Sequence, residues 1–262
     1  MKALYTAGTG MRVQQLQVDT IANNLANANT TGFKRSEVAF QDLLYQTIQQ
    51  PGLETARGQV SPTGLQVGSG ARAVSTTKVF GQGAIEETGR DLDLAIQGDG
   101  FLQVTLPDGS SAYTRDGSLR IDANGGLVTA EGLALAPQIT IPADASEITI
   151  GKDGTITALS AGATESATTL GQLTLVCFPN PTGLSSEGGN LYRATPSSGA
   201  ASVVTPGEGG AGTIAQRFLE KSNVEVVNEL VGLIVAQRAY EVNSRAIKAG
   251  DEMMGQVSNL GR

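Results

Sequence analysis

The chain has 262 residues, a net charge of −7 and no histidine. This length suffices for one large core or for two domains, and the negative charge argues against nucleic acid as a general partner. Histidine is the commonest general base and the commonest metal ligand, so its absence argues against an enzyme, a bound metal or another cofactor, and a small-molecule substrate.

Residues 4–25 carry apolar side chains at alternating steps of three and four residues. This 3.5-residue period is typical of a helix that packs lengthwise on other helices. Gly8 and Gly10 weaken the first turns of this helix. Either they allow another backbone to approach closely, or the helix begins only after Gly10. The seam that we expect to pack between subunits consists of Leu4, Ala7, Met11, Val18, Ile21 and Leu25, with Gln14 as a polar member.

The helical pattern runs into the stretch IANNLANANTTGFKR, residues 21–35. An amide both donates and accepts hydrogen bonds, so asparagines beside the seam can set its register against a neighbouring chain. The alternative is that they only end the helix, because Asn and Gly tolerate the left-handed conformation. We expect both, with a stop and a change of direction at Thr31-Gly32. The residues of this register and turn motif are Asn23, Asn24, Asn27, Gly32 and Phe33.

Lys34 and Arg35 follow the turn directly. Such a pair is more often a solvated flank or a salt-bridge donor than a binding site for an acidic surface.

The middle of the chain has a different character. Residues 40–70 begin apolar and become polar around Pro51-Gly52 and Pro62, which predicts an extended arm or long hairpin. From about residue 71 to residue 213, Gly, Thr and Val are frequent and the polarity alternates with period two. Asp-Gly and Asn-Gly pairs supply the positive φ that tight hairpins need. These pairs are Asp99-Gly100, Asp108-Gly109, Asp116-Gly117 and Asn124-Gly125. An antiparallel β domain of meander or barrel type is therefore predicted.

Candidate chemical sites in this region are weak. Asp91, Asp93 and Asp99 lack the order of a calcium loop, and exposed strand acids with a turn Asp explain them better. The neighbours Glu86 and Glu87 point apart on a strand, so they do not form a catalytic carboxylate pair. Cys177 is the only cysteine and lies in an apolar run, which favours a small buried hydrophobe.

The C-terminal segment from Leu219 to Leu260 is again helical in pattern. Ser222 and Glu225 have the spacing of a capping box, in which each side chain bonds a backbone amide of the first turn. The apolar seam of this helix consists of Val227, Val231, Val235, Val242, Ala246 and Met253, with a stutter between Val231 and Val235.

The expected fold is therefore α+β. Long N- and C-terminal helices pair as a coiled-coil-like domain, and the middle forms a mostly antiparallel β domain with an extended hairpin arm. The expected domains are residues 1–39 with 214–262 (helical, discontinuous), residues 40–70 (arm) and residues 71–213 (β-rich). Without an apolar run of about 18 residues or a cleavable signal, these patterns alone predict a cytoplasmic protein.

Several segments resemble the bacterial flagellar axial proteins, the rod and hook group. The NNLAN and TTGFKR stretches are similar to their N-terminal signature. Four further segments look most like the distal rod subunits: FQDLLYQTIQQPG, GRDLDLAIQGDGFLQV, AYTRDGSLRIDANGGLVTAEG and LEKSNVEVVNELVGLIVAQRAYEVNS.

The resemblance implies a structural subunit of the distal rod, a drive shaft that self-assembles into a rigid helical tube and transmits torque to the hook. Terminal helices would form the inner tube, the β domain an outer layer, and an arm at about residues 46–63 would stiffen the shaft. The implied partners are further copies of the chain, proximal rod proteins, the hook protein, basal-body ring proteins and the type III export apparatus. The implied location is the basal body from the periplasm to the outer membrane, reached without a cleaved signal peptide, which replaces the cytoplasmic prediction.

Two alternatives remain open at this point. One is a proximal rod or hook-type axial subunit, and the other is a secreted adhesin or binding module with a helical stalk. The low aromatic content of 4% counts against a sugar-binding module, because such sites usually rely on aromatic platforms.

Overall fold

The computed structural model describes residues 2–51, 63–160 and 168–260. The chain divides into two compact units. The first comprises Met1–Ala26, Ser36–Thr77 and Glu225–Arg262, and the second comprises Asn27–Arg35 and Lys78–Val224. Residues 214–224, which we expected to join the helical domain, belong to the second unit because two strands formed there pair with strands of that unit.

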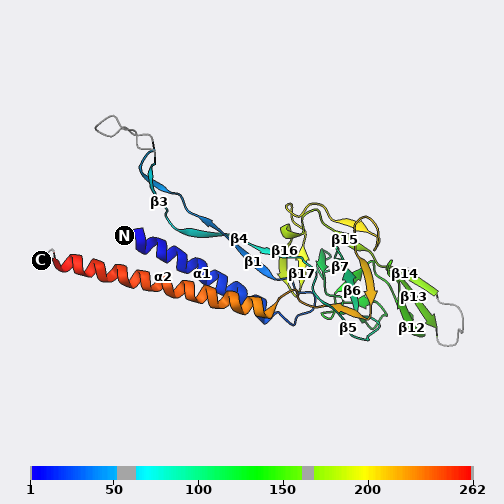
Figure 1. Ribbon diagram of the computed structural model, residues 1–262. Helices are drawn as coiled ribbons and strands as arrows, with labels where there is room; N and C mark the ends of the chain where they lie inside the picture. Colours follow the sequence, from blue (N-terminus) through cyan, green and yellow to red (C-terminus); the bar gives the residue numbers. More distant parts are fainter. Residues whose placement is uncertain (1, 52–62, 161–167, 261–262) are drawn as a thin grey trace. The chain divides into compact units, whose positions relative to one another are not determined.

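Two long helices belong to the first unit. Helix α1 spans Lys2–Ala26 and helix α2 spans Val226–Leu260. They lie side by side and run antiparallel, with the two ends of the chain at the same end of the pair (Figure 1). The alternative in which the first helix begins after Gly10 is therefore wrong. Among the described residues, neither helix has an apolar stretch long enough to cross a membrane.

The described residues of the first unit also form four strands. Strand β1 (Ser36–Asp42) pairs with β4 (Ala71–Lys78), and β2 (Gln46–Gln49) pairs antiparallel with β3 (Leu65–Val67). These strands include much of the predicted arm at 40–70. Residues 52–62, which fall within that prediction, lie outside the described part of the chain.

The second unit is built from short strands, and every pairing with a defined register in it is antiparallel. Its largest sheet has seven strands in the order β16-β17-β8-β7-β11-β10-β9. These strands are β7 (Leu102–Thr105), β8 (Ser111–Thr114), β9 (Arg120–Ile121), β10 (Leu127–Val128), β11 (Ala134–Ala136), β16 (Ser185–Gly188) and β17 (Leu191–Arg193). The prediction of an antiparallel β-rich middle is confirmed.

Smaller sheets complete the unit. A three-stranded sheet consists of β12 (Ala145–Ile150), β13 (Thr155–Ser160) and β14 (Thr168–Gln172). Three two-stranded pairs are β15 (Leu175–Cys177) with β18 (Ser202–Val204), β19 (Thr213–Gln216) with β6 (Leu94–Gln97), and β20 (Phe218–Glu220) with β5 (Ile85–Glu87). A short 3₁₀ helix spans Pro181–Gly183.

The hydrophobic core lies in this second unit. One cluster is aliphatic and includes Leu94, Ile96, Leu135, Ile156 and Leu175. A second cluster is aromatic: Phe101, Tyr113, Phe178 and Tyr192 pack there with edge-to-face ring contacts. These aromatic residues therefore serve packing, whereas four others are exposed: Tyr5, Phe40, Tyr45 and Tyr240.

The turn chemistry of the sequence is visible in two hairpins. Gly109 (φ 80°) lies between β7 and β8, and Gly125 (φ 84°) lies between β9 and β10. Gly117 has another role, because a methyl group added there would lie 1.9 Å from the Leu94 carbonyl oxygen. Small residues are therefore required both for turns and for close contact between backbone segments.

Asp93 and Cys177 differ in burial from what their sequence context predicts. Asp93, expected as an exposed strand acid, is 1% exposed and accepts hydrogen bonds from Arg90 (2.6 and 2.9 Å) and from the Thr88 hydroxyl (2.6 Å). A buried carboxylate needs such partners, and Arg90 supplies them from three residues away. Cys177 is a free thiol and is half-buried.

Candidate functional site

The contact between α1 and α2 depends on small residues of α2. A methyl group added at Gly250 would lie 2.7 Å from Leu4 Cδ2, and one added at Gly232 would lie 3.4 Å from Ile21 Cδ1. Gly10 of α1 approaches Asn243 in the same way, at 2.9 Å from Nδ2. The absence of side chains at these positions lets the two backbones approach closely, so Gly10 serves a close contact inside a continuous helix.

The seam predicted for α1 is mostly covered within the chain. Ala7 and Ile21 are buried, and the other four members are half-buried: Leu4, Met11, Val18 and Leu25. Sequence reasoning missed Val13, which is 7% exposed. Our expectation that this seam packs chiefly between subunits is therefore incomplete, because α2 covers part of it in the same molecule.

The seam predicted for α2 is exposed instead. Its members are 55–73% exposed at the large positions Val227, Val231, Val235, Val242 and Met253, and Ala246 is exposed as well. The row that faces α1 is a different one, and its centre is Ala236, which is 0% exposed. Sequence reasoning missed this second row, although Gly232, Ala236, Asn243 and Gly250 recur at helical spacing and all but Asn243 are small.

Asn24 connects α1 to its surroundings within the first unit. Its side chain is 1% exposed and bonds both backbone groups of Ser36: Nδ2 donates to the carbonyl (2.9 Å), and Oδ1 accepts from the amide (2.8 Å). Nδ2 also lies 3.3 Å from Glu229 Oε1 on α2. The expectation that Asn24 sets register against a neighbouring chain is thus corrected, because these bonds are intramolecular. Asn23 is exposed on the same helix.

The predicted helix cap also needs correction. Helix α2 begins at Val226, four residues after Ser222. Ser222 Oγ instead accepts a hydrogen bond from Val224 N (3.3 Å), and the Glu225 carbonyl accepts the first helical bond from Glu229 N (3.0 Å). Glu225 therefore lies at the helix boundary itself, where its carboxylate accepts a bond from the Asn228 side chain.

The turn after α1 is tied firmly into the second unit. Helix α1 ends at Ala26, five residues before the stop that we expected at Thr31-Gly32, and Gly32 has φ 68°. Gly32 N donates to the Glu220 carbonyl (2.8 Å). The Phe33 side chain is buried, with Lys78 Nζ 4.4 Å from the centre of its ring. The residues Asn27, Gly32 and Phe33 thus serve to fix this turn.

Lys34 is fully buried. Of the two roles expected for it, a solvated flank or a salt-bridge donor, it has the second. Its Nζ lies 2.5 Å from Glu220 Oε1 and 2.8 Å from the Gly81 carbonyl, and Arg115 Nη1 lies 3.3 Å from Glu220 Oε2. Burial lowers the pKa of Lys34 because the ammonium loses its hydration, while the Glu220 carboxylate opposes this shift. Nothing in the local sequence pairs Lys34 with a residue 186 positions away.

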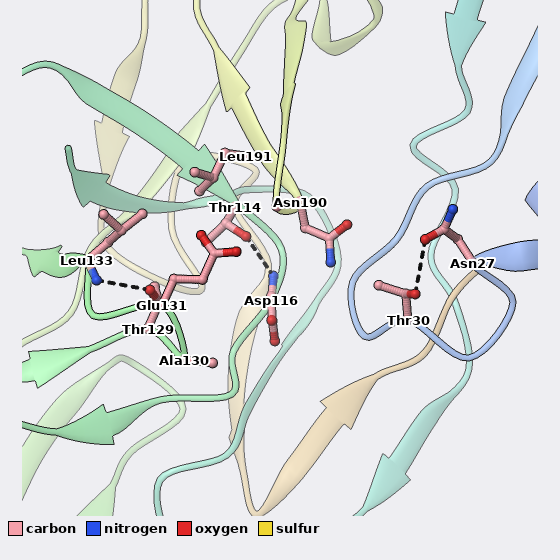
Figure 2. A pocket seen from close by; sticks show the side chains of 11 residues that line it. Asn27, Thr30, Thr114, Asp116, Thr129, Ala130, Glu131, Leu133, Asn190 and Leu191 are labelled. Carbon is pink, nitrogen blue, oxygen red and sulfur yellow. Dashed lines mark hydrogen bonds between the residues drawn. The ribbon is translucent and has the colours of Figure 1, made fainter. Parts of the chain in front are cut away.

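A recess of about 300 Å³ lies beside this turn, and Figure 2 shows the side chains that line it. Asn27 and Thr30 line one side, with the Thr30 hydroxyl 3.2 Å from Asn27 Oδ1. The Asp116 and Glu131 carboxylates make the recess negative. Asn190, which also lines it, donates to the Thr31 carbonyl (2.9 Å) and so holds the turn in place. Among the described residues, His, Cys, Asp and Glu do not gather in a group of three that could hold a metal ion.

Comparison with known proteins identifies the family. Three family models match: "Flagella basal body rod protein" over residues 4–34, "Flagellar hook protein FlgE/F/G D1 domain" over 95–158, and "Flagellar basal body rod FlgEFG protein C-terminal" over 215–260. The first and third matches cover the two helical ends of the chain, and the second lies in the β-rich middle. The resemblance to the rod and hook group is confirmed.

Individual relatives match along nearly their whole length. The flagellar basal-body rod protein FlgG of Buchnera aphidicola (from Acyrthosiphon pisum) is 46% identical over 258 residues, which cover 98% of this chain and 99% of the relative. FlgG of Borreliella burgdorferi is 46% identical over 264 residues (100% and 99%), and FlgG of Bacillus subtilis is 40% identical over 269 residues (100% of each). The predicted role as a structural rod subunit is confirmed, and the chain belongs to the FlgG family of flagellar basal-body rod proteins.

Proposed function

We propose that the chain polymerises with further copies of itself into the distal rod, a rigid helical tube that transmits torque to the hook. The observation that carries this proposal is the exposed apolar row on α2. Full burial of a valine side chain stabilises by about 1.5–3 kcal/mol relative to an exposed one. A row of this size, left in water in the single chain, therefore strongly favours association.

The proposal also assigns a place in the tube to each part of the subunit. The two terminal helices act as a coiled-coil-like pair that lines the inner tube, and the β-rich unit forms an outer layer. Support for the pair comes from the close contacts of α1 with Gly232 and Gly250. An arm at about residues 46–63 stiffens the shaft; the pairing of β2 with β3 supports an extended hairpin at its base.

The partners and location belong to the proposal as well. The subunit joins proximal rod proteins at one end and the hook protein at the other, and it passes through basal-body ring proteins. It reaches this place, which spans the periplasm to the outer membrane, through the type III export apparatus. Its role is structural and not enzymatic. Family membership supports this set of partners.

The direct test is polymerisation of the purified chain. Wild type should form filaments by electron microscopy and sedimentation, whereas the variant Val231→Lys/Val235→Lys should remain monomeric, because two ammonium groups cannot be buried without partners. Glu252→Lys adds the same charge at an exposed polar position and should polymerise like wild type. A wild-type chain that never polymerises, or a double variant that assembles normally, would contradict the proposal.

The stiffening arm has its own test. Deletion of residues 46–63 should leave polymerisation intact and increase the bending of the filaments in electron micrographs. Unchanged curvature would rule out this role of the arm.

A further inference from the structure

A second recess, of about 320 Å³, is lined entirely by residues of the β-rich second unit. Its walls are aromatic: Phe101 and Phe178 are 2% and 8% exposed, and their ring centres lie 5.9 Å apart. Phe80, which is half-buried, adds a third ring. This volume is at the lower end of the range for small-ligand sites, so the recess suits one small molecule.

Backbone hydrogen bonds between segments distant in the sequence shape this recess. Phe101 and Val176 each donate to the other's carbonyl, at 2.9 Å in both directions. The Asp99 carbonyl accepts from Gly212 N (2.7 Å) and so fixes the neighbouring loop, residues 205–213, which supplies part of the lining. The cavity is therefore formed before any ligand binds, which reduces the entropic cost of binding.

Arg115 lines the recess and has an N–H group without a partner. Its side chain is 2% exposed. Nη2 donates to the Gly98 carbonyl (2.7 Å), and Nη1 lies 3.3 Å from Glu220 Oε2, but Nε has no hydrogen-bond partner among the described residues. Buried donors in folded proteins almost always have an acceptor. The unpaired N–H therefore favours a ligand that brings an acceptor into the recess.

The charges around the recess favour a ligand with both an anionic and a cationic group. Glu220 is shared with Lys34 (2.5 Å), so the buried cluster has two cations for one carboxylate. At the rim, Asp99 is exposed and Cys177 is half-buried. Burial raises the pKa of the Cys177 thiol; the charge of Asp99 adds to this shift, and that of Arg115 opposes it. A cation in the interior and an anion at the rim therefore line the same cavity.

We propose that this recess binds an α-amino acid with an aromatic or large apolar side chain. The carboxylate of this zwitterion accepts a hydrogen bond from Arg115 Nε, and its ammonium group pairs with Asp99. Its side chain packs against Phe101 and Phe178. A charge-assisted hydrogen bond is strong where water is excluded, as it is around Arg115. The site lies within one unit of a single copy, so this inference goes beyond the proposed function and does not depend on polymerisation.

Cys177, the only cysteine of the chain, reports whether the recess is occupied, because it lines the same cavity. The full-length protein is alkylated with iodoacetamide, and mass spectrometry follows the rate at increasing concentrations of L-phenylalanine. We expect alkylation of Cys177 to slow and to reach a plateau.

Two probes that each lack one charged group test the two polar contacts. The amine 2-phenylethylamine has no carboxylate and loses the buried hydrogen bond to Arg115, so it should need a concentration at least about tenfold higher for the same protection. The acid 3-phenylpropanoate has no ammonium group and loses only the exposed pair with Asp99, so it should need a concentration about two- to fivefold higher. Arg115 belongs to the buried cluster, so its own replacement would test folding instead of binding.

Two variants complete the test. Asp99→Asn removes the charge at an exposed position and should abolish the preference for phenylalanine over 3-phenylpropanoate. Asp144→Asn, at another exposed position outside the recess lining, should keep this preference. Equal protection by the three probes, or a preference that persists in Asp99→Asn, would overturn the inference. Alkylation that phenylalanine does not slow at any concentration would overturn it as well.

Discussion

Lys34 Nζ lies 2.5 Å from Glu220 Oε1, and both side chains are completely buried. Arg115 approaches the other carboxylate oxygen at 3.3 Å, and Gly83 N donates to Oε1 at 2.8 Å. This cluster fixes the turn after α1 to strand β20, which lies shortly before α2 in the sequence. Glu220 is the anion that pairs with both cations of this cluster, so the loss of its carboxylate would leave Lys34 and Arg115 buried without compensation.

Replacement of Glu220 by Leu should therefore destabilise the chain by about 3–5 kcal/mol in urea unfolding, as is usual when one partner of a buried ion pair is removed. The matched control is Glu86→Leu. Glu86 also pairs at 2.5 Å, with Lys221, but both side chains are about half exposed. Solvent screening limits such a pair to less than about 1 kcal/mol.

Similar losses of stability in these two variants would contradict the prediction that the buried pair contributes more to stability than the exposed pair. The triple variant Lys34→Met/Arg115→Met/Glu220→Leu gives a second measurement. It removes all three charges together and should regain most of the stability lost by Glu220→Leu, because no uncompensated charge remains.

The features that sequence reasoning predicted well are those that local rules determine. The apolar period of residues 4–25 predicts α1, and the Asp-Gly and Asn-Gly pairs at 108–109 and 124–125 predict two hairpins. Both signals depend on residues close together in the chain, where backbone preference and side-chain spacing decide the structure.

The features that it missed depend on distant partners. Helix α2 carries two rows at helical spacing, one of valines and one of small residues, and the period alone does not tell which row faces α1. The valines carry the apolar period and so predict the seam, but close approach of two helices favours Gly232 and Ala236. Burial of Lys34 likewise depends on Glu220, which only the folded chain brings near.

The buried side chain of Tyr192 makes the stability of the folded chain depend on pH. Its ring is 2% exposed and packs edge-to-face with Phe80 (5.2 Å) and Phe101 (5.9 Å). Burial raises the pKa of Tyr192 from 10.0 to about 12. Between these two values the unfolded chain has lost the phenolic proton and the folded chain has kept it. The contribution of Tyr192 to stability is therefore fully present below pH 10 and is lost as the pH rises through about 12.

The measurement is urea unfolding at a series of alkaline pH values, with tyrosinate absorbance followed in parallel. Wild type should lose stability over this window, and Tyr192→Phe should lose less because its ring has no proton to release. An equal slope in the two proteins would show that other groups cause the loss.

Gly32 combines a left-handed backbone with a close contact. Its φ is 68°, and a methyl group there would lie 2.8 Å from the Arg115 carbonyl carbon and from Asp116 N. Gly89 has φ 69° and no atom within 4 Å of such a methyl group. Gly89→Ala should therefore cost only the backbone strain, about 1–2 kcal/mol. Gly32→Ala should cost clearly more in urea unfolding, because backbone atoms must also move. Equal losses of stability in the two variants would show that the backbone around Gly32 accommodates the methyl group without strain.

Alanine substitutions at Gly8 and Gly10, within one turn of α1, distinguish the effect of helix propensity on stability from the effect of packing against α2. Replacement of an interior glycine by alanine stabilises a helix by about 1 kcal/mol when the methyl group is accommodated. At Gly8 nothing lies within 4 Å of the new methyl group, so Gly8→Ala should show this gain in full. At Gly10 the methyl group would lie 2.9 Å from Asn243 Nδ2, so the side chain of Asn243 must move and the gain should be reduced or lost. Urea unfolding of the two variants under the same monomeric conditions gives the comparison. The two variants carry the same substitution at neighbouring helical positions near the start of α1. Equal gains in stability would therefore mean that α1 and α2 do not approach closely at Gly10.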